Sequence, residues 1–384
     1  MGYFLWGLFG VDMNVWLDAF VRLNIVVAVM TVVVLFLIYL ERKFVGRIQM
    51  RLGPMRTGPY GSLQTAADAI KLLTKEDLRP TTADRWLFEL APFVAFVPVF
   101  MVLLALPFTE DWGVRDLQLG LFYIVAVSGV TVLGYIMAGW ASDNKYALLG
   151  AVRSAAQLIS YELPLILAVL SVSMVAGSLN LREIVIAQDQ AVPFIVIQPL
   201  PFLILLTAAL AELSRRPFDI PIGESELVGG PWVEYSGIRW SIMFALAEYA
   251  SMFGLSVLGA LIFLGGWEWP FGRDWGLVWQ LFLISSKTML LILMFMWIGA
   301  TFPRLRIDQL MAFCWKILLP FGFLQVIING IVLVADFDKV VRDVLLALTS
   351  GVLLVAMAYV IYLATRQPAR SERVAPVAVR SPAT

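Results

Sequence analysis

Long apolar runs alternate with polar segments along most of the chain. A run of about 20 apolar residues is long enough to cross the roughly 30 Å hydrocarbon core of a bilayer as an α-helix. The pattern predicts nine spans, at about 21–40, 87–107, 118–140, 157–177, 194–213, 241–264, 277–300, 315–335 and 343–364. The predicted fold class is an all-α polytopic membrane protein, because a membrane β-barrel would show alternating segments of about ten residues.

Two polar segments are too long and too patterned to be simple connections. In the first, residues 41–86, apolar positions recur at helical spacing from Leu63 to Leu73. This stripe predicts an interfacial amphipathic helix over about 62–76, with Ser62 as its N-cap. The second is the acidic loop, about 214–240, which is rich in glycine and proline.

These elements form one predicted membrane domain, residues 1–365, followed by a polar, proline-rich tail at 366–384 that we expect to be disordered. The first span is too long for a cleaved signal peptide, and a strongly basic segment follows it. Of the 28 Lys and Arg residues, 21 fall on one predicted side. The positive-inside rule then places the N-terminus outside and the C-terminus in the cytoplasm or an equivalent compartment.

Composition supports this class, since 60% of the residues are hydrophobic and only 15% are charged. The chain has no histidine and a single cysteine, Cys314. It therefore cannot supply a four-cysteine iron–sulfur site, an axial histidine for haem or a histidine-based zinc site. No metal site is predicted, and any electrons must arrive from a partner.

Acidic residues gather around the fifth and sixth spans. Six carboxylates lie between residues 212 and 248: Glu212, Asp219, Glu224, Glu226, Glu234 and Glu248. An acid at the centre of a membrane helix costs about 2.5–3.5 kcal/mol, so intramembrane acids are functional candidates. Burial raises the pKa of a carboxylic acid and lowers that of an amine, and clustered acids titrate together. The cluster therefore predicts a path for protons.

Several motifs follow one another in a characteristic order. They are ERKFVGRIQMRLGPMRTGPYG (41–61), ADAIKLLTKEDLRP (67–80), KYALLGAVRSAAQLISYELPL (145–165), AELSRRPFDIPIGESELVGG (211–230), EYSG (234–237), AEY (247–249), LGGWEWP (264–270) and PRLRIDQLM (303–311). Together they resemble the family of the quinone-site membrane subunit of respiratory complex I, the NADH-quinone oxidoreductase of bacteria and mitochondria.

The resemblance implies a subunit at the joint between a peripheral redox arm and a proton-pumping membrane arm. Such a subunit is part of an NADH:quinone oxidoreductase and is not catalytic alone. Quinone is the substrate, and flavin and iron–sulfur clusters belong to partner subunits. The implied partners are peripheral-arm quinone-site subunits, small membrane subunits, antiporter-like subunits and membrane lipid, with no nucleic acid.

The resemblance also implies roles for particular residues. Positions near the quinone path are Arg42, Arg51, Asp68 and Arg304. Positions on the proton and coupling path are Glu162, Glu212, Glu224, Glu226, Glu234, Glu248 and Lys287.

The chain departs from the family pattern at a few positions. Most relatives have a glutamate at the position of Ile222 and an arginine at that of Gly299. Ser214 and Arg216 replace an asparagine and a small residue. The separation of Glu234 from Glu248 is one residue longer than usual, which leaves open the helix face on which the second acid lies.

Structural roles remain as alternatives for most of these residues. Glu162 could cap or pair at the start of its span, Glu212 could pair with Arg215 or Arg216, and Lys287 could snorkel or neutralise an acid. Asp68 and Lys71 have the spacing of an ordinary helical ion pair. The acids of the loop could contact only a partner arm. Finally, Trp267, Trp269 and Trp275 are predicted to form a membrane-interface belt.

Three other functions compete with the main interpretation. The nearest is the equivalent subunit of a membrane-bound hydrogenase or another complex I-like assembly. The run from Arg42 to Pro54 favours a quinone enzyme over that alternative. A stand-alone ion-coupled transporter would use a midplane site between discontinuous helices, and a structural anchor would not need acids within its spans.

Overall fold

The structure, a computed structural model, describes residues 15–110, 112–189, 192–221, 223–268, 276–335 and 337–366. Every regular element in these ranges is helical, which confirms the all-α class. Four predicted features lie outside the described residues: Ile222, Trp269, Trp275 and nearly all of the tail.

The helices are α2 (Val15–Ile48), η1 (Pro59–Gly61), α3 (Gln64–Thr74), α4 (Arg85–Ala105), α5 (Gly120–Ser128), α6 (Thr131–Ala141), α7 (Lys145–Ala176), α8 (Leu181–Asp189), α9 (Phe194–Ile197), α10 (Pro199–Glu212), α11 (Glu224–Leu227), η2 (Gly230–Trp232), α12 (Gly237–Trp240), η3 (Ser241–Leu246), α13 (Ala247–Phe263), α14 (Leu277–Thr301), α15 (Ile307–Phe313), η4 (Cys314–Leu318), α16 (Leu319–Val334) and α17 (Lys339–Arg366). Of these, η1 and η2 are 3₁₀ segments, whereas η3 and η4 are π-helical.

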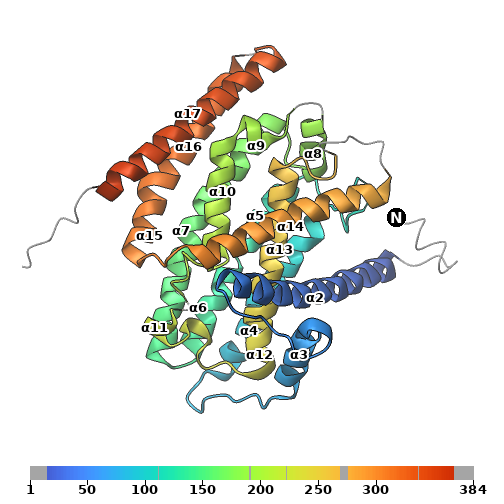
Figure 1. Ribbon diagram of the computed structural model, residues 1–384, viewed down its shortest axis with the longest axis vertical. Helices are drawn as coiled ribbons and strands as arrows, with labels where there is room; N and C mark the ends of the chain where they lie inside the picture. The colour runs from blue at the N-terminus through green and yellow to red at the C-terminus, as the bar shows by residue number, and fades with distance from the viewer. Residues whose placement is uncertain are drawn as a thin grey trace, which may run out of the picture.

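Among the described residues, helices occupy all nine predicted span positions. Seven helical segments are long and apolar enough to cross a membrane, and two shorter apolar helices, α10 and α13, occupy the fifth and sixth predicted positions. In the most apolar window of α7, 61% of the residues are buried, against 17% in α2 and in α17. Helix α7 is therefore the central element, with α6, α10 and α16 packed around it (Figure 1).

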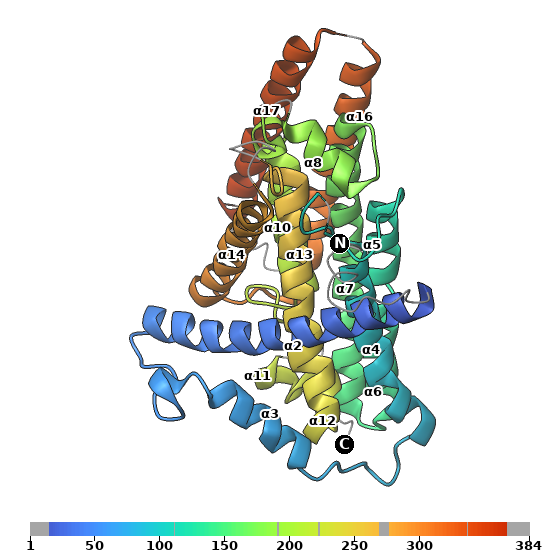
Figure 2. The same cartoon turned by 90° about the vertical axis from the view of Figure 1, so that its right-hand side faces the viewer.

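Helix α2 lies across the bundle and not along it (Figure 2). It crosses α13 at a steep inclination and continues beyond it to the segment that leads into α3 (Figure 2). It contacts α13 and α14 along its length and α3 near its end. At 34 residues, it extends into the basic motif that the sequence placed after the first span and ends at Ile48.

Helix α7 begins 12 residues earlier than predicted, at Lys145 instead of residue 157. Asn144 caps it, because the side-chain oxygen accepts a hydrogen bond from the backbone N–H of Tyr146 at 2.9 Å. Charges at Lys145 and Arg153 interrupt the apolar run, so the pattern hid the first turns of the helix. Glu162 consequently lies near the middle of α7, so the alternative in which it caps the start of a span does not hold.

Helix α10 is only 14 residues long, about 21 Å, and is too short to cross the hydrocarbon core alone. Irregular backbone follows it, which a membrane tolerates only where protein or water covers the peptide groups. Gln157 on α7 supplies part of that cover, donating to the carbonyls of Ala211 and Phe218 at 2.7 Å each. The acidic loop is thereby attached to α7.

The sixth predicted span is continuous from α12 through η3 into α13. In a π-helix each N–H bonds the carbonyl five residues back, so a π segment accommodates one more residue than an α-helical turn. Segment η3 ends immediately before Ala247 and so lies between Glu234 and Glu248. The π-helical segment therefore accommodates the one additional residue between Glu234 and Glu248 without ending the helix.

The predicted amphipathic helix is present as α3, within the range 62–76. Its N-cap is Leu63, which makes no side-chain capping bond, so the assignment of Ser62 was wrong. Ile70 and Leu73 are exposed along this helix, each with 62% of its surface accessible. Their exposure fits an apolar face that is covered by something outside this chain.

Helices α4 and α6 approach closely at Gly134, and a substitution there tests this contact. A Cβ atom there would lie 2.5 Å from the backbone nitrogen of Ala95, so Gly134→Ala must push the two helices apart. We expect a loss of about 1–3 kcal/mol, seen as a lower thermal unfolding midpoint in detergent. Gly351→Ala, on α17 with no neighbour within 4 Å, is the matched control and should not lower the midpoint.

Candidate functional site

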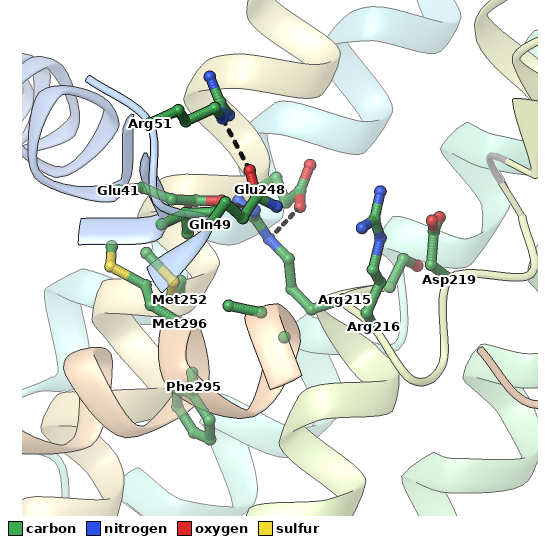
Figure 3. A pocket seen from close by; sticks show the side chains of 14 residues that line it. Glu41, Gln49, Arg51, Arg215, Arg216, Asp219, Glu248, Met252, Phe295 and Met296 are labelled. Carbon is green, nitrogen blue, oxygen red and sulfur yellow. Dashed lines mark hydrogen bonds and ion pairs between the residues drawn. The ribbon is translucent and has the colours of Figure 1, made fainter. Parts of the chain in front are cut away.

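A cavity of about 320 Å³ opens where the end of α2 meets the loop after α10 and the facing ends of α13 and α14 (Figure 3). Its lining combines charged side chains with an apolar wall. The lining residues are Glu41, Val45, Gln49, Arg51, Ser214, Arg215, Arg216, Asp219, Glu248, Met252, Phe295, Met296, Gly299 and Ala300.

Arg215 is the electrostatic centre of this cavity. Its Nη1 lies 2.5 Å from Oε1 of Glu41, and its Nε lies 2.6 Å from Oε1 of Glu248. The guanidinium also stacks 4.7 Å above the ring of Tyr249. Burial acts to lower the pKa of Arg215, but Glu248 and Glu41 outweigh it and raise the pKa well above its ordinary value, so this side chain stays cationic.

The ion-pair cluster formed by Glu41, Arg215 and Glu248 was missed in part by sequence reasoning. The sequence nominated Glu248 but offered Arg215 only as a partner for Glu212, and it gave Glu41 no role. In the described structure Arg215 pairs with Glu41 and Glu248, so that pairing was wrong. The signal was absent because nothing in a one-dimensional pattern shows that α2 brings Glu41 beside Arg215 and Glu248.

The remaining wall of the cavity is amphiphilic. Arg51 donates through Nε to the side-chain oxygen of Gln49 at 2.8 Å, while Met252, Phe295 and Met296 supply apolar surface. At Gly299, the nearest neighbour of an added Cβ would be the carbonyl oxygen of Arg216, 3.7 Å away. Because this chain has glycine at a position where most relatives have arginine, there is open space in this wall.

Two predicted quinone-path residues, Arg42 and Asp68, connect segments beside the cavity and do not line it. Nη1 of Arg42 lies 2.6 Å from Oδ2 of Asp68, joining α2 to α3, and Lys71 lies 3.5 Å from the same carboxylate. Partial burial acts to raise the pKa of Asp68, but the hydrogen bond and charge of Arg42 hold it below the ordinary value. The predicted Asp68–Lys71 pair exists, and Arg42 is the closer partner.

Arg304 has a similar connecting role. It donates to the backbone carbonyl of Asp219, and its Nε lies 3.8 Å from the carboxylate of the same residue. The backbone N–H of Leu305 also bonds the carbonyl of Pro217 at 3.0 Å. These contacts attach the segment after α14 to the start of the acidic loop.

The intramembrane acids form a sequence that leads away from the cavity. Glu162 lies at the break between α5 and α6, where an added Cβ on Gly129 would be 2.6 Å from its Oε1. Glu212 lines a second cavity together with Ser251 of α13, which lies three residues after Glu248. The fold therefore gathers acids from three helices that the sequence could only place on separate spans.

The acids of the loop dock on the N-terminal half of α7. Glu226 lies 2.7 Å from Nη1 of Arg153, and Glu234 accepts a hydrogen bond from Nδ2 of Asn144 at 2.6 Å. The side chain of Glu224 lies outside the described part of the structure. The part of α7 that sequence analysis assigned to a connection is thus the platform for this loop.

Lys287 lies apart from these acids. Its Nζ donates to the carbonyls of Leu264 and Gly266, at 2.7 and 2.6 Å, just beyond the C-terminal end of α13. Leu264 is 16 residues from Glu248, which is about 24 Å along a helix. Trp267, in the same region, is only 1% exposed, so its predicted place in an interface belt is wrong.

Comparison with known proteins settles the family. The family model described as NADH dehydrogenase matches residues 21–330, which is well over half of the chain. The chain belongs to the NADH dehydrogenase family. Within this family it is similar to bacterial proteins that are named as the H subunit of NADH-quinone oxidoreductase.

Three such relatives show the extent of the similarity. The protein from Dehalococcoides mccartyi strain CBDB1 is 49% identical over 315 residues, covering 82% of this chain and 87% of the relative. That from Brevibacillus brevis is 50% identical over 312 residues, 80% of this chain and 91% of the relative. The Geobacillus kaustophilus protein is 50% identical over 311 residues, or 80% and 92%.

The ion-pair cluster predicts a large effect at Arg215. In Arg215→Gln, Glu41 and Glu248 lose their shared cation, and breaking a buried pair in this way costs about 3–5 kcal/mol. We expect a corresponding fall in the free energy of unfolding, measured by denaturation in mixed micelles. The neighbouring Arg216 is exposed, so Arg216→Gln should stay within about 0.5 kcal/mol. Equal losses in both variants would contradict a special role for Arg215.

Proposed function

We propose that this chain is the membrane subunit of a proton-translocating NADH:quinone oxidoreductase that forms the entrance of the quinone chamber and the acidic coupling path. Family membership and the names of its relatives support the complex. Flavin and iron–sulfur clusters would reside in partner subunits, because this chain has no histidine and one cysteine. Its partners are the peripheral-arm and membrane-arm subunits of that complex.

The observation that carries the proposal is the cavity around Arg215. Its volume of about 320 Å³ lies in the range of small-molecule sites. A quinone has a planar ring with two carbonyl acceptors and a long apolar tail. Arg51 offers hydrogen-bond donors and Phe295 and Met296 offer apolar surface, so the wall suits both parts of the molecule.

The charges beside the cavity give a physical route from quinone chemistry to proton movement. Reduction of a quinone to a quinol takes two electrons and two protons, so negative charge develops at the ring until protons arrive. A unit charge about 10 Å from a carboxylate, at an effective dielectric constant of about 20, changes its energy by about 1.7 kcal/mol. That is more than one pKa unit and is enough to move a proton.

Glu248 is placed to respond to such a change. It lines the cavity, pairs with Arg215, and lies on the helix that leads toward Glu212 and Glu162. The acidic loop begins directly after Glu212 and is bonded to α7 through Gln157. A shift in the charge balance at Arg215 would therefore act on both the acids and the loop.

The rival functions differ in what they would need from these residues. A structural anchor has no use for an ion-pair cluster at the wall of a cavity. A stand-alone transporter would need no docking segments, whereas α3 exposes an apolar face beside the basic end of α2. Extraction in mild detergent tests this directly: a large assembly with quinone reductase activity supports the proposal, and a lone chain that transports ions overturns it.

Filling the cavity should impair quinone access. Gly299→Trp places a large side chain in the open part of the wall, and we expect the KM for quinone to rise about tenfold, equivalent to about 1.4 kcal/mol. Reduction of a water-soluble artificial acceptor by the same complex should not change. Gly351→Trp, on the weakly buried α17, is the size-matched control. An unchanged KM in an assembled Gly299→Trp complex would place the quinone elsewhere.

Removing one acid should impair pumping. Glu212→Gln keeps the shape of the side chain but cannot release a proton, so we expect coupled proton translocation in vesicles to fall about tenfold or more. Glu183→Gln removes an exposed carboxylate on α8 and should leave the complex unaffected. If the assembled Glu212→Gln complex pumps at the normal rate and stoichiometry, this acid is not on the path.

A further inference from the structure

We infer that Tyr135 is a proton-relay residue, whose hydroxyl, with water in the cavity beside it, passes protons between Glu212 and Glu248. The inference rests on the proposed coupling path and adds to it a side chain that is not an acid. It assigns Tyr135 a role that neither the motifs nor the family resemblance suggested.

The first argument is the position of Tyr135 on the wall of a second cavity. This cavity, of about 50 Å³, lies between α6, α10 and α13, with further walls from α4, α5 and α7. Tyr135 lines it from α6, Glu212 from the end of α10, and Ser251 from α13. Ser251 is three residues after Glu248, so the two lie on neighbouring turns of one helix face. The cavity thus extends from Glu212 toward the turn of α13 that carries Glu248.

The polar lining makes this cavity suitable for water. A water molecule needs roughly 10–15 Å³ of such space and two to four polar partners. Ser128 and Thr131 line the cavity beside Tyr135, and their hydroxyls already donate to the carbonyls of Val125 and Ser128 at 2.9 and 2.7 Å. Their oxygen lone pairs therefore remain able to accept hydrogen bonds from water.

The second argument is that the two acids have no direct contact. In the described residues no ion pair or hydrogen bond joins Glu212 to Glu248, and Glu248 is held toward the first cavity by Arg215. Tyr135 shares the second cavity with Glu212, and Ser251 brings the turn of α13 that carries Glu248 to the same cavity. Tyr135 thus lies between the parts of the fold that hold the two acids.

A phenol hydroxyl can carry out the transfer without changing its own charge. The protonated acid gives its proton to a water molecule as that water gives a proton to the phenol oxygen. The O–H proton passes to a second water molecule, which gives a proton to the carboxylate of the other acid. One proton enters and one leaves, so the phenol is neutral before and after the step. No bond to carbon changes, and no oxidant or reductant is needed.

The ring of Tyr135 is held in place independently of its hydroxyl. It packs edge-to-face against Trp232, with ring centroids 4.9 Å apart and an interplanar angle of 73°. Trp232 is buried and belongs to η2, in the acidic loop. Because this contact uses only the rings, Tyr135→Phe should keep the packing and remove only the relay group.

The test uses the assembled complex in sealed vesicles. For Tyr135→Phe we expect coupled quinone-reduction turnover to fall about tenfold, because proton transfer through a positioned group is replaced by water alone. The solvent deuterium isotope effect on turnover should increase, and the KM for quinone should stay unchanged. A purely structural role for the ring would move neither the turnover nor the isotope effect in this variant.

Tyr123→Phe is the matched control, because Tyr123 is a tyrosine on the neighbouring α5 that is not among the residues lining the second cavity. It should retain normal turnover and a normal isotope effect. If Tyr135→Phe does not assemble, Ser251→Val tests the same cavity by narrowing it. A fall in turnover supports the relay, and normal turnover in the assembled Ser251→Val complex overturns it.

The outcomes separate this inference from the proposed function. If Glu212→Gln stops pumping while Tyr135→Phe has normal turnover and isotope effect, the relay is wrong and the coupling path stands. If neither variant changes pumping, the coupling path itself is wrong and the relay falls with it.

Discussion

The arrangement of this protein depends on a single buried cation. A guanidinium inside a membrane protein is stable only when anions accompany it, and Arg215 obtains one carboxylate from α2 and another from α13. These helices are far apart in sequence, and α2 crosses α13 at a steep inclination. Because Arg215 must be neutralised, three segments that surround the cavity are held together. They are the end of α2, the start of the acidic loop and the start of α13.

The acidic loop is held by a second set of contacts, all on one helix. Gln157 binds its backbone, Arg153 and Asn144 bind its acids, and Gly150 allows the backbone at Gly230 to approach closely. These residues occupy the N-terminal half of α7, the most deeply buried of the long helices. A loop that is rich in glycine is thereby given a defined path over a rigid support.

Hydrophobic patterning was sufficient to find the membrane helices, because apolar length is read directly from the sequence. The pattern failed where charged residues lie within a buried helix. Lys145 and Arg153 hid the first turns of α7. As a result, Glu162 was placed at the start of a helix although it lies in the middle. Most candidate acids could be named in advance, since an acid in an apolar run is conspicuous. Glu41 and Tyr135 could not, because their importance comes from helix crossings and from a shared cavity, which no spacing along the chain expresses.

The inclination of α2 has a consequence for the surrounding lipid. Its 34 residues measure about 51 Å, so α2 is long enough to cross the roughly 30 Å hydrocarbon core at a tilt. A leaning helix responds to a thinner or thicker membrane by changing its tilt. Because Glu41 lies near the end of α2 and pairs with Arg215, a change of tilt would move its carboxylate relative to the guanidinium, so the length of the lipid acyl chains would bear on the charge balance of the site.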